Sequence, residues 1–479
     1  MSARSHLVCE YGEIIHWDAT SFLTLHDGYN SQVYHGKISP SPLQDGWLWL
    51  RGILGGLGRF SQALACTFLR KRPDGMPVKS PYLLLMATGT AKFASEEREI
   101  VEACKQRGLD VLRVYPGKGV GVSAAGPILP LFSVLRAGDY ARAMASWSWA
   151  VLLGTRHLFS RDPKRRSLFA ASIFPIRQYF VCVGLAQRIA AIHGLPWAAL
   201  SLCPTAAMSV AVVDCLKAAG VATAGIRTQT TSRHAEHLAI NVDVLFCKGR
   251  HERAVYENLF AGKGPRLENA CLLSLPEVYP LAPLSLPDKY ALVLGTAPAS
   301  GQSDEEYWDF NERLFRVAEA AGLPLVFKGH GMAAELDDAW LAKCDARGER
   351  CLRISDVRRN RELMDRAALV VSAATTLLYY ALLRGTPVIL VQSQTDSAIP
   401  DEFRGAPLAR NTPAEDLDSV RIDWPALLDS ARNAQTWFKE NYFLEKGPDA
   451  ILDDLLGGRD GETASAREGK REGDHAATT

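Results

Sequence analysis

The chain has 479 residues, of which 47% are hydrophobic and 22% are charged, and its formal net charge is +1. At roughly 100–200 residues per domain, this length predicts two or three domains of a soluble globular protein. The near-neutral balance excludes the cationic surplus with which nucleic-acid-binding proteins neutralise phosphates, so we expect no nucleic-acid partner. No stretch reaches the roughly 18 uncharged apolar residues that a membrane span needs.

The ten cysteines include no Cys-x-x-Cys pair, and the histidines form no cluster with metal-ligand spacing. This pattern predicts reduced, mostly buried thiols in a cytoplasmic compartment, and no metal site. The first ten residues carry no apolar run behind their positive charge, so we expect no signal peptide.

Residues 1–80 are an N-terminal extension that could pack on the first domain. Within it, residues 47–72 are apolar, rich in tryptophan and glycine, and end on three basic residues. One interpretation is a packed helix whose solvated end carries the charges. The other is an interfacial element, with tryptophans at headgroup level and cations against anionic lipid.

Residues 81–276 alternate between short apolar runs and segments of helical length, which predicts a first domain of β-α units. The predicted strands are residues 82–87, 111–115, 197–202, 221–226, 242–247 and 270–275.

Between the second and third of these strands, residues 125–180 are expected to be helical and are unusually apolar for a surface segment. They contain Trp147 and Trp149, and the basic run 161–166 follows. Residues 143–166 are therefore a second candidate for contact with a membrane or a lipid substrate, and a buried helix followed by a charged turn is the alternative.

A proline-rich linker at residues 277–287 separates this region from a second domain at residues 288–457. The second domain begins with a strand at residues 290–294 and a helix that Ser303 and Glu306 open with a capping box. Two terminal helices are predicted within residues 424–457. Residues 458–479 are polar and charged, and we expect them to be disordered.

The rest of the second domain repeats the β-α-β pattern, with apolar runs that stop at small, polar or charged residues. Ligands of such sheets bind outside the carboxyl ends of the strands. We therefore expect a nucleotide site formed by the residues that fall there: Gly295, Thr296, Lys328, His330, Ser355, Asp356, Ser372, Thr375 and Thr376.

The order of four motifs over about residues 240–395 resembles the GT-B glycosyltransferases. The motifs are Lys328-Gly-His330, Ser355-Asp356, Ala374-Thr375-Thr376 and Gly385-Thr-Pro387-Val388. Within that superfamily the chain is most similar to bacterial enzymes that build capsule, teichoic-acid or lipopolysaccharide glycans, such as sialyl-, Kdo- and glycerol-phosphate transferases. The resemblance implies an α/β protein with two Rossmann-like domains facing a central cleft, a nucleotide-sugar donor and a glycan or lipid-linked acceptor.

Three positions depart from the pattern of these enzymes. Gly331 follows His330 where the family usually has proline, and Tyr380 stands where an acidic residue often binds ribose. Gln229-Thr230-Thr231 replaces a Gln-His-Gly at a strand end of the first domain. Two alternatives to a transferase therefore stay open, namely a nucleotide-sugar epimerase of the same architecture and an inactive assembly or binding subunit.

Each residue of the predicted nucleotide site has two interpretations. Thr375 and Thr376 precede a helix, where they could hold a phosphate or simply cap the helix. Lys328 and His330 could donate to the phosphates or the base in place of a metal ion, or be a solvated lysine and a structural histidine. Asp356 could accept from the ribose, base or sugar, or cap the next helix.

The turn at Gly295 and Thr296 could admit a phosphate or a sugar by close backbone approach, or be an ordinary strand-to-helix turn. Because no Asp-x-Asp motif ends a strand, the sequence predicts a mechanism without a metal ion or cofactor. The general base should come from the first domain, and the candidates are His234, Glu236 and His237. Each of them could instead be structural. The expected location is the cytoplasm, with peripheral contact to the inner face of the membrane.

Overall fold

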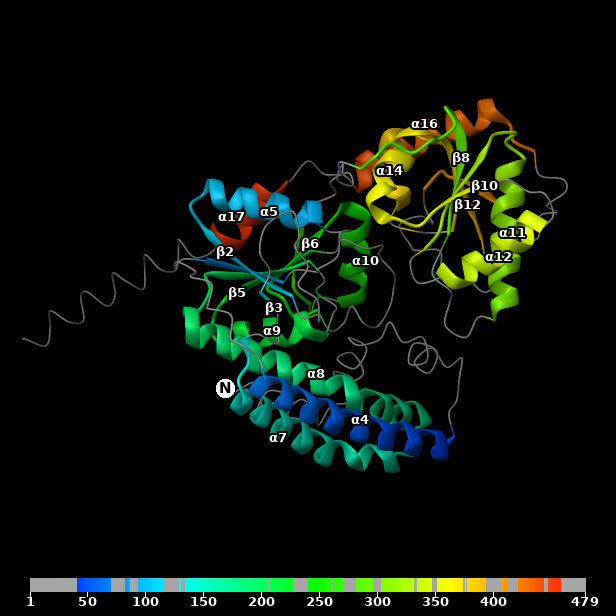
Figure 1. Cartoon of the computed structure of the whole chain (residues 1–479). Helices are drawn as coiled ribbons and strands as arrows, with labels where there is room; N and C mark the ends of the chain where they lie inside the picture. The colour runs from blue at the N-terminus through cyan, green and yellow to red at the C-terminus, as the bar shows by residue number, and fades with distance from the viewer. Residues whose placement is uncertain are drawn as a thin grey trace, which may run out of the picture.

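The computed structural model describes residues 41–69, 82–86, 94–115, 129–130, 134–202, 204, 207–226, 240–260, 262, 264–270, 281–295, 303–330, 334–346, 351–373, 375, 377–392, 406–411, 421–442 and 447–457. These residues form two α/β units, each built on a parallel sheet (Figure 1). The prediction of two Rossmann-like units is confirmed.

The first sheet has the strand order β3-β2-β1-β4-β5-β6-β7 in the described part of the chain, and all of its pairs are parallel. Its strands are β1 (Tyr82–Met86), β2 (Asp110–Tyr115), β3 (Leu129–Pro130), β4 (Ala198–Ser201), β5 (Ala222–Ile226), β6 (Val244–Cys247) and β7 (Arg266–Asn269). The central strands are largely apolar because helices cover both faces of the sheet.

Of the strand predicted at residues 270–275, all but Ala270 lie outside the described residues, so that prediction stays open. The edge strand of the described sheet is β7, whose sequence Arg-Leu-Glu-Asn is polar and partly exposed. An edge strand has one neighbour and is open to solvent, so it does not need an apolar sequence. A search for apolar runs therefore does not find β7.

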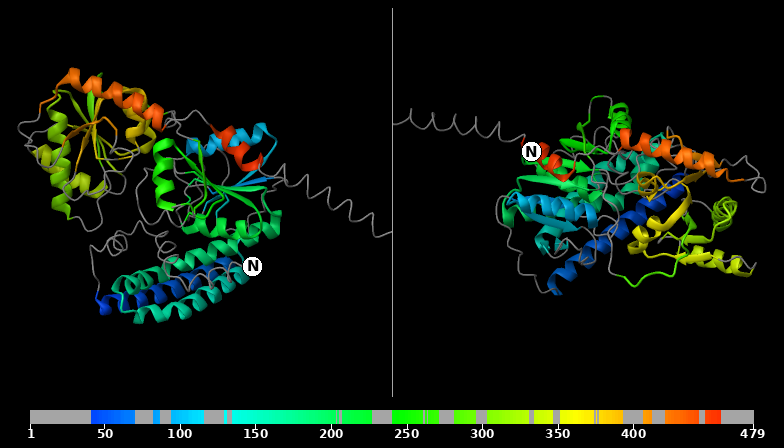
Figure 2. Two further views of the ribbon diagram at one scale, coloured as in Figure 1. Left: turned by 180° about the vertical axis from the view of Figure 1, so that it is seen from behind. Right: turned by 90° about the horizontal axis from the view of Figure 1, so that it is seen from above.

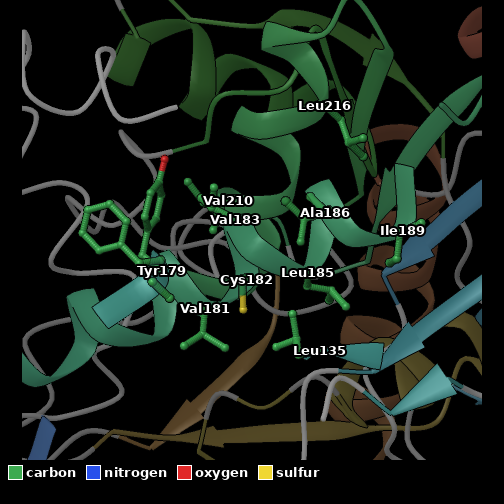
Figure 3. Packing of buried hydrophobic residues seen from close by; sticks show 14 of the residues in the cluster. Leu135, Tyr179, Val181, Cys182, Val183, Leu185, Ala186, Ile189, Val210 and Leu216 are labelled. Carbon is green, nitrogen blue, oxygen red and sulfur yellow. The ribbon is translucent and has the colours of Figure 1, made fainter. Parts of the chain in front are cut away.

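Three long helices form a bundle on one face of the first sheet: α4 (Pro42–Leu69), α7 (Ala137–Gly154) and α8 (Pro163–His193), with the short η2 (Thr155–Phe159) between the last two. Helix α8 lies nearest to the sheet, and α4 and α7 lie farther out (Figures 1 and 2). It is buried on nearly all sides because it packs against both outer helices and against α9 (Ala207–Ala218). Figure 3 shows the apolar side chains of α8 together with Val210 and Leu216 of α9. This position explains why the segment is too apolar for a surface helix.

The opposite face of the first sheet is covered by α5 (Ala94–Gln106) and by α17 (Pro448–Gly457), the last described helix. Leu83 and Leu85 of β1 point to this face, while Leu84 points to the bundle. Arg107 binds Asp449 and Asp453 of α17 at 2.9 and 2.7 Å. Residues 448–457 were assigned to the second domain by their place in the sequence, but in space their helix packs on the first.

The second sheet has the order β10-β9-β8-β11-β12-β13 in the described residues. Its strands are β8 (Tyr290–Leu294), β9 (Leu325–Lys328), β10 (Cys351–Ile354), β11 (Ala367–Ser372), β12 (Val388–Val391) and β13 (Ala409–Asn411). The helices that flank it are α11 (Asp304–Glu319), α12 (Ala334–Ala346), α13 (Asn360–Arg366), α14 (Leu377–Arg384) and α16 (Trp424–Asn441). A further helix, α10 (Arg250–Phe260), follows β6 of the first sheet.

The predicted capping box at the start of α11 is confirmed, since Ser303 Oγ accepts from the N–H of Glu306 and the N–H of Ser303 donates to Glu306. Among the described helices, none combines the length and the apolar character needed to cross a bilayer.

Candidate functional site

Four neighbouring strands of the second sheet end at the same level. The register pairs Ser372 with Leu294, Leu294 with Lys328, and Lys328 with Ile354. The last residues of β11, β8, β9 and β10 therefore lie side by side. The chain runs outward from β8 to β10 on one side and then crosses to β11 on the other, and ligands of α/β sheets bind at such a switch point.

Lys328 ends β9 and is buried at this edge, with only 5% of its surface exposed. Its ammonium group donates to the carbonyls of Gly329 at 2.9 Å and Ser355 at 3.1 Å, so it joins the segments that follow β9 and β10. Burial lowers the pKa of Lys328, although Asp356 and Asp337 oppose the shift. Two of its three N–H groups are thus used on the main chain.

Asp356 lies directly after Ser355 at the end of β10. Both of its carboxylate oxygens accept from the Arg358 side chain, at 2.7 to 3.0 Å, and one also accepts from the Arg358 N–H at 2.9 Å. These hydrogen bonds hold the pKa of Asp356 below its ordinary value. The structure therefore shows the capping interaction that was one of the two interpretations of Asp356. Its role toward a ligand stays a prediction.

Three further site residues lie at the carboxyl ends of β8 and β11 or shortly after them. The N–H of Gly295 donates to the Lys328 carbonyl at 2.9 Å, and Ser372 Oγ donates to the Leu294 carbonyl at 3.3 Å. Thr375 precedes α14, and its carbonyl accepts from the N–H of Leu378. Because Ser372 is fully buried, it holds two strand ends together behind the edge.

A buried group under the Lys328-Gly-His330 segment escaped the sequence analysis. Asp337, on α12, is fully buried and accepts from the Tyr307 hydroxyl at 2.7 Å. Burial raises the pKa of Asp337, while the Tyr307 hydroxyl, Arg353, the His330 N–H and Lys328 oppose the shift. This carboxylate thus supports the segment from below. The sequence does carry a signal for it, since Asp337 lies three residues before the buried Trp340 and so shares its helix face.

Gly329 makes this close approach possible. A Cβ atom at this position would lie 2.7 Å from Asp337 Oδ2. Any side chain there would push the segment away from α12, so Gly329 sets the position of both flanking site residues.

The two domains meet near the carboxyl ends of their sheets. Lys248 and Gly249 follow β6 of the first sheet, and Tyr379 lies in the first turn of α14, which follows β11 of the second. The Lys248 ammonium lies 5.4 Å from the centre of the Tyr379 ring. His251 of α10 contacts the rings of Trp437 and Tyr442, with centroids 6.0 and 5.5 Å apart.

Five of the predicted site residues lie outside the described part of the chain. They are His234, Glu236, His237, Thr296 and Thr376. Their roles stay predictions. Among the described residues, no group of three or more His, Cys, Asp and Glu side chains gathers where it could hold a metal ion.

Tyr380 of α14 is buried at 8% exposure in the core that also contains residues of β11 and α16. The structure therefore has a buried aromatic ring, and no carboxylate, at this position.

Comparison with solved structures places this chain beside UDP-glucose:anthocyanidin 3-O-glucosyltransferase in complex with UDP. The TM-score is 0.51 at 9% identity, covering 80% of this chain and 100% of that chain. A putative UDP-N-acetylglucosamine 2-epimerase from Listeria monocytogenes has a TM-score of 0.49 at 14% identity, covering 78% of this chain and 97% of that chain. UDP-GlcNAc 2-epimerase from Neisseria meningitidis bound to UDP-GlcNAc has a TM-score of 0.49 at 10% identity, covering 79% of this chain and 100% of that chain.

Searches with protein-family models and against curated protein sequences gave no match. At identities this low the structural likeness concerns the fold alone. Two parallel Rossmann-like sheets and the likeness to the glucosyltransferase together assign the fold, which is GT-B.

Proposed function

We propose that this protein is a glycosyltransferase that moves a sugar from a nucleotide-activated donor to a hydroxyl of a bacterial surface glycan or lipid-linked acceptor. The observation that carries the proposal is that β10, β9, β8 and β11 of a GT-B fold end at the same level. At or directly after these strand ends lie Gly295, Lys328, Ser355 and Ser372. This edge offers backbone groups, a cation and hydroxyls to one nucleotide.

In the proposed reaction the acceptor oxygen attacks the anomeric carbon, its proton goes to a base, and the nucleotide phosphate leaves with the bonding electrons. Negative charge thus develops on the phosphate, where preorganised donors stabilise it. We assign this role to the third N–H of Lys328, to His330 and to the groups before α14, including Thr375 and Thr376. No metal ion or cofactor is part of the proposal. The base would come from the first domain, with His234, Glu236 and His237 as candidates.

The proposed acceptor class is the one implied by the resemblance of the sequence motifs to enzymes of capsule, teichoic-acid and lipopolysaccharide synthesis. With it we propose a location in the cytoplasm at the inner face of the membrane. A binding subunit without catalysis is the second candidate, because the buried Tyr380 removes a ribose-binding carboxylate from the site.

Thermal unfolding of the purified full chain against CMP, CDP, UDP, GDP and their common sugar conjugates tests the proposal. A ligand at about 100 times its Kd adds roughly 2.7 kcal/mol of stability, which is a clear shift of the unfolding midpoint. Thr375→Ala should reduce the shift, whereas Thr436→Ala, an exposed threonine on α16, should leave it unchanged.

Incubation of the identified donor with and without acceptor glycans then separates the candidates. Sugar transfer supports the transferase, whereas conversion of the donor sugar without any acceptor identifies an epimerase. A bound donor that stays unaltered with every acceptor supports the binding subunit. If no nucleotide shifts the midpoint, the proposed site is wrong.

A further inference from the structure

Helix α4 exposes an apolar stripe along almost its whole length. The exposed large side chains recur at alternating spacings of four and three residues, which is the repeat of one helix face. They are Leu43, Trp47, Leu50, Leu54, Leu57 and Leu64. The stripe is not the packed face of the helix, because Gly52, Gly56 and Phe60 are buried on the other side.

Helix α7 and η2 add further exposed apolar side chains beside α4. Trp149 is 42% exposed, Leu152 is 64% exposed and Phe159 is 82% exposed. Helices α4 and α7 lie side by side at the outside of the bundle, and α8 separates them from the sheet (Figures 1 and 2). The outer side of the bundle therefore carries far more apolar surface than the scattered single residues that are normal on soluble proteins.

The same helices carry a local excess of positive charge. Residues 41–69 and 134–193 contain eleven Lys and Arg but three Asp and no Glu, whereas the whole chain has a net charge of +1. Asp45 and Asp139 are buried, and they pair with Arg166 at 2.6 Å and with Arg142 at 2.5 Å. Asp162 is thus the exposed carboxylate within these two described ranges.

We propose that the outer face of α4 and α7 binds the surface of an anionic lipid bilayer. Tryptophans and phenylalanine among leucines suit the boundary between headgroups and acyl chains, and cations beside them attract anionic lipid. Arg51 and Arg59 are exposed on α4 next to the stripe. The stripe from Leu43 to Leu64 is roughly 32 Å long at about 1.5 Å per residue, so it lies along the surface.

The charge favours lipid over a second copy of the chain. Two copies joined through this face would bring Arg51 and Arg59 of one copy near those of the other, and like charges at an interface oppose association. An anionic bilayer instead carries the charge opposite to these exposed arginines. Binding there would place the first domain at the surface that holds a lipid-linked acceptor, although the proposal does not depend on donor binding.

Vesicle flotation of the purified full chain tests this proposal. Vesicles of phosphatidylcholine with about one third phosphatidylglycerol should carry the protein upward, and pure phosphatidylcholine should carry much less. Raising NaCl from about 0.1 to 1 M should weaken the binding, because the Debye length falls from roughly 10 to 3 Å. Leu54→Glu with Leu57→Glu, and separately Arg51→Glu with Arg59→Glu, should each lower the partition coefficient by roughly tenfold or more.

The matched control is Leu352→Glu with Leu428→Glu, which places two carboxylates on exposed leucines of the second domain and should leave flotation unchanged. Circular dichroism and the thermal midpoint show whether each variant is folded. The proposal is overturned if the full chain stays at the bottom with anionic vesicles, or if the α4 variants float as well as the wild type. Light scattering that shows a dimer, dissociated by Leu54→Glu, would assign the face to a second copy instead.

Discussion

The ammonium nitrogen of Lys248 in the first domain lies 5.4 Å from the centre of the Tyr379 ring in the second. Each residue comes shortly after the carboxyl end of a strand, β6 for Lys248 and β11 for Tyr379, so the contact brings the same edge of both sheets together. Gly249, the next residue, is so close to α16 that a Cβ atom would lie 1.9 Å from the Asn441 carbonyl oxygen. The relative position of the domains is thus set beside the edge that carries the candidate site.

Lys248 and its partner Glu252 are buried almost completely, with Nζ 3.1 Å from the carboxylate. Glu252→Ala removes the carboxylate but leaves the ammonium buried, and breaking a buried ion pair in this way costs about 3–5 kcal/mol. Glu257→Ala breaks the exposed pair with Arg253 on the same helix and should cost under about 1 kcal/mol. Urea unfolding measures the loss of stability in both variants.

The double variant Lys248→Met with Glu252→Leu should recover most of the loss, because neither charge then stays buried without the other. If Glu252→Ala lowers the free energy of unfolding as little as Glu257→Ala does, the buried pair of Lys248 and Glu252 does not stabilise the protein at the contact between the domains.

The level strand ends were predictable because a buried parallel strand is an apolar run, and the run stops where the chain leaves the sheet. Lys328, Asp356 and Ser372 were placed correctly at that edge for this reason. What their side chains bind was not predictable. The Lys328 ammonium donates to two main-chain carbonyls, and those depend on the path of the segments after β9 and β10.

Asp337 was missed for a different reason. It lies in an acidic pair on a helix, which is typical of a solvated face, and its burial depends on how α12 packs against Tyr307 of α11. The position of α17 was also hidden, since sequence order says nothing about a helix that returns to the first domain.

Burial raises the pKa of Asp337 above its ordinary value of 3.8, so the folded state holds a proton more tightly than the unfolded chain. The free energy of unfolding should therefore fall as the pH rises from just below 3.8 through the folded-state pKa. Asp337→Asn lacks this titration, so its stability relative to the wild type should increase across that window. Urea unfolding between about pH 3.5 and 7 measures the difference.

The control is Asp288→Asn, a fully exposed carboxylate of the same domain. If the stability of Asp337→Asn relative to the wild type stays constant, or falls, as the pH rises, the raised pKa is contradicted.

Two glycines of α4 should respond in opposite directions to alanine. A Cβ atom on Gly56 would lie 2.5 Å from the ring of Trp147, which is buried and donates to the Ile173 carbonyl at 2.8 Å. Gly56→Ala should therefore cost about 1–3 kcal/mol by overpacking. Gly58 has nothing within 4 Å, so Gly58→Ala should stabilise the helix by about 0.5–1 kcal/mol.

Thermal unfolding of the two single variants is sufficient to test this pair, because each is the control of the other. If both alanines stabilise the protein, α4 does not pack against α7 through Gly56.

Helix α17 should stabilise the first domain through its apolar face and hardly at all through its ion pairs. Leu452 is fully buried against the first sheet and α5, so Leu452→Ala should cost about 2–5 kcal/mol. Arg107→Ala removes contacts to two largely exposed carboxylates and should cost under about 1 kcal/mol. Hydrogen exchange locates the effect, because loosening α17 should speed amide exchange in α5 and leave α11 of the second domain unchanged. Faster exchange in α11 with none in α5 would mean that the last helix belongs to the second domain after all.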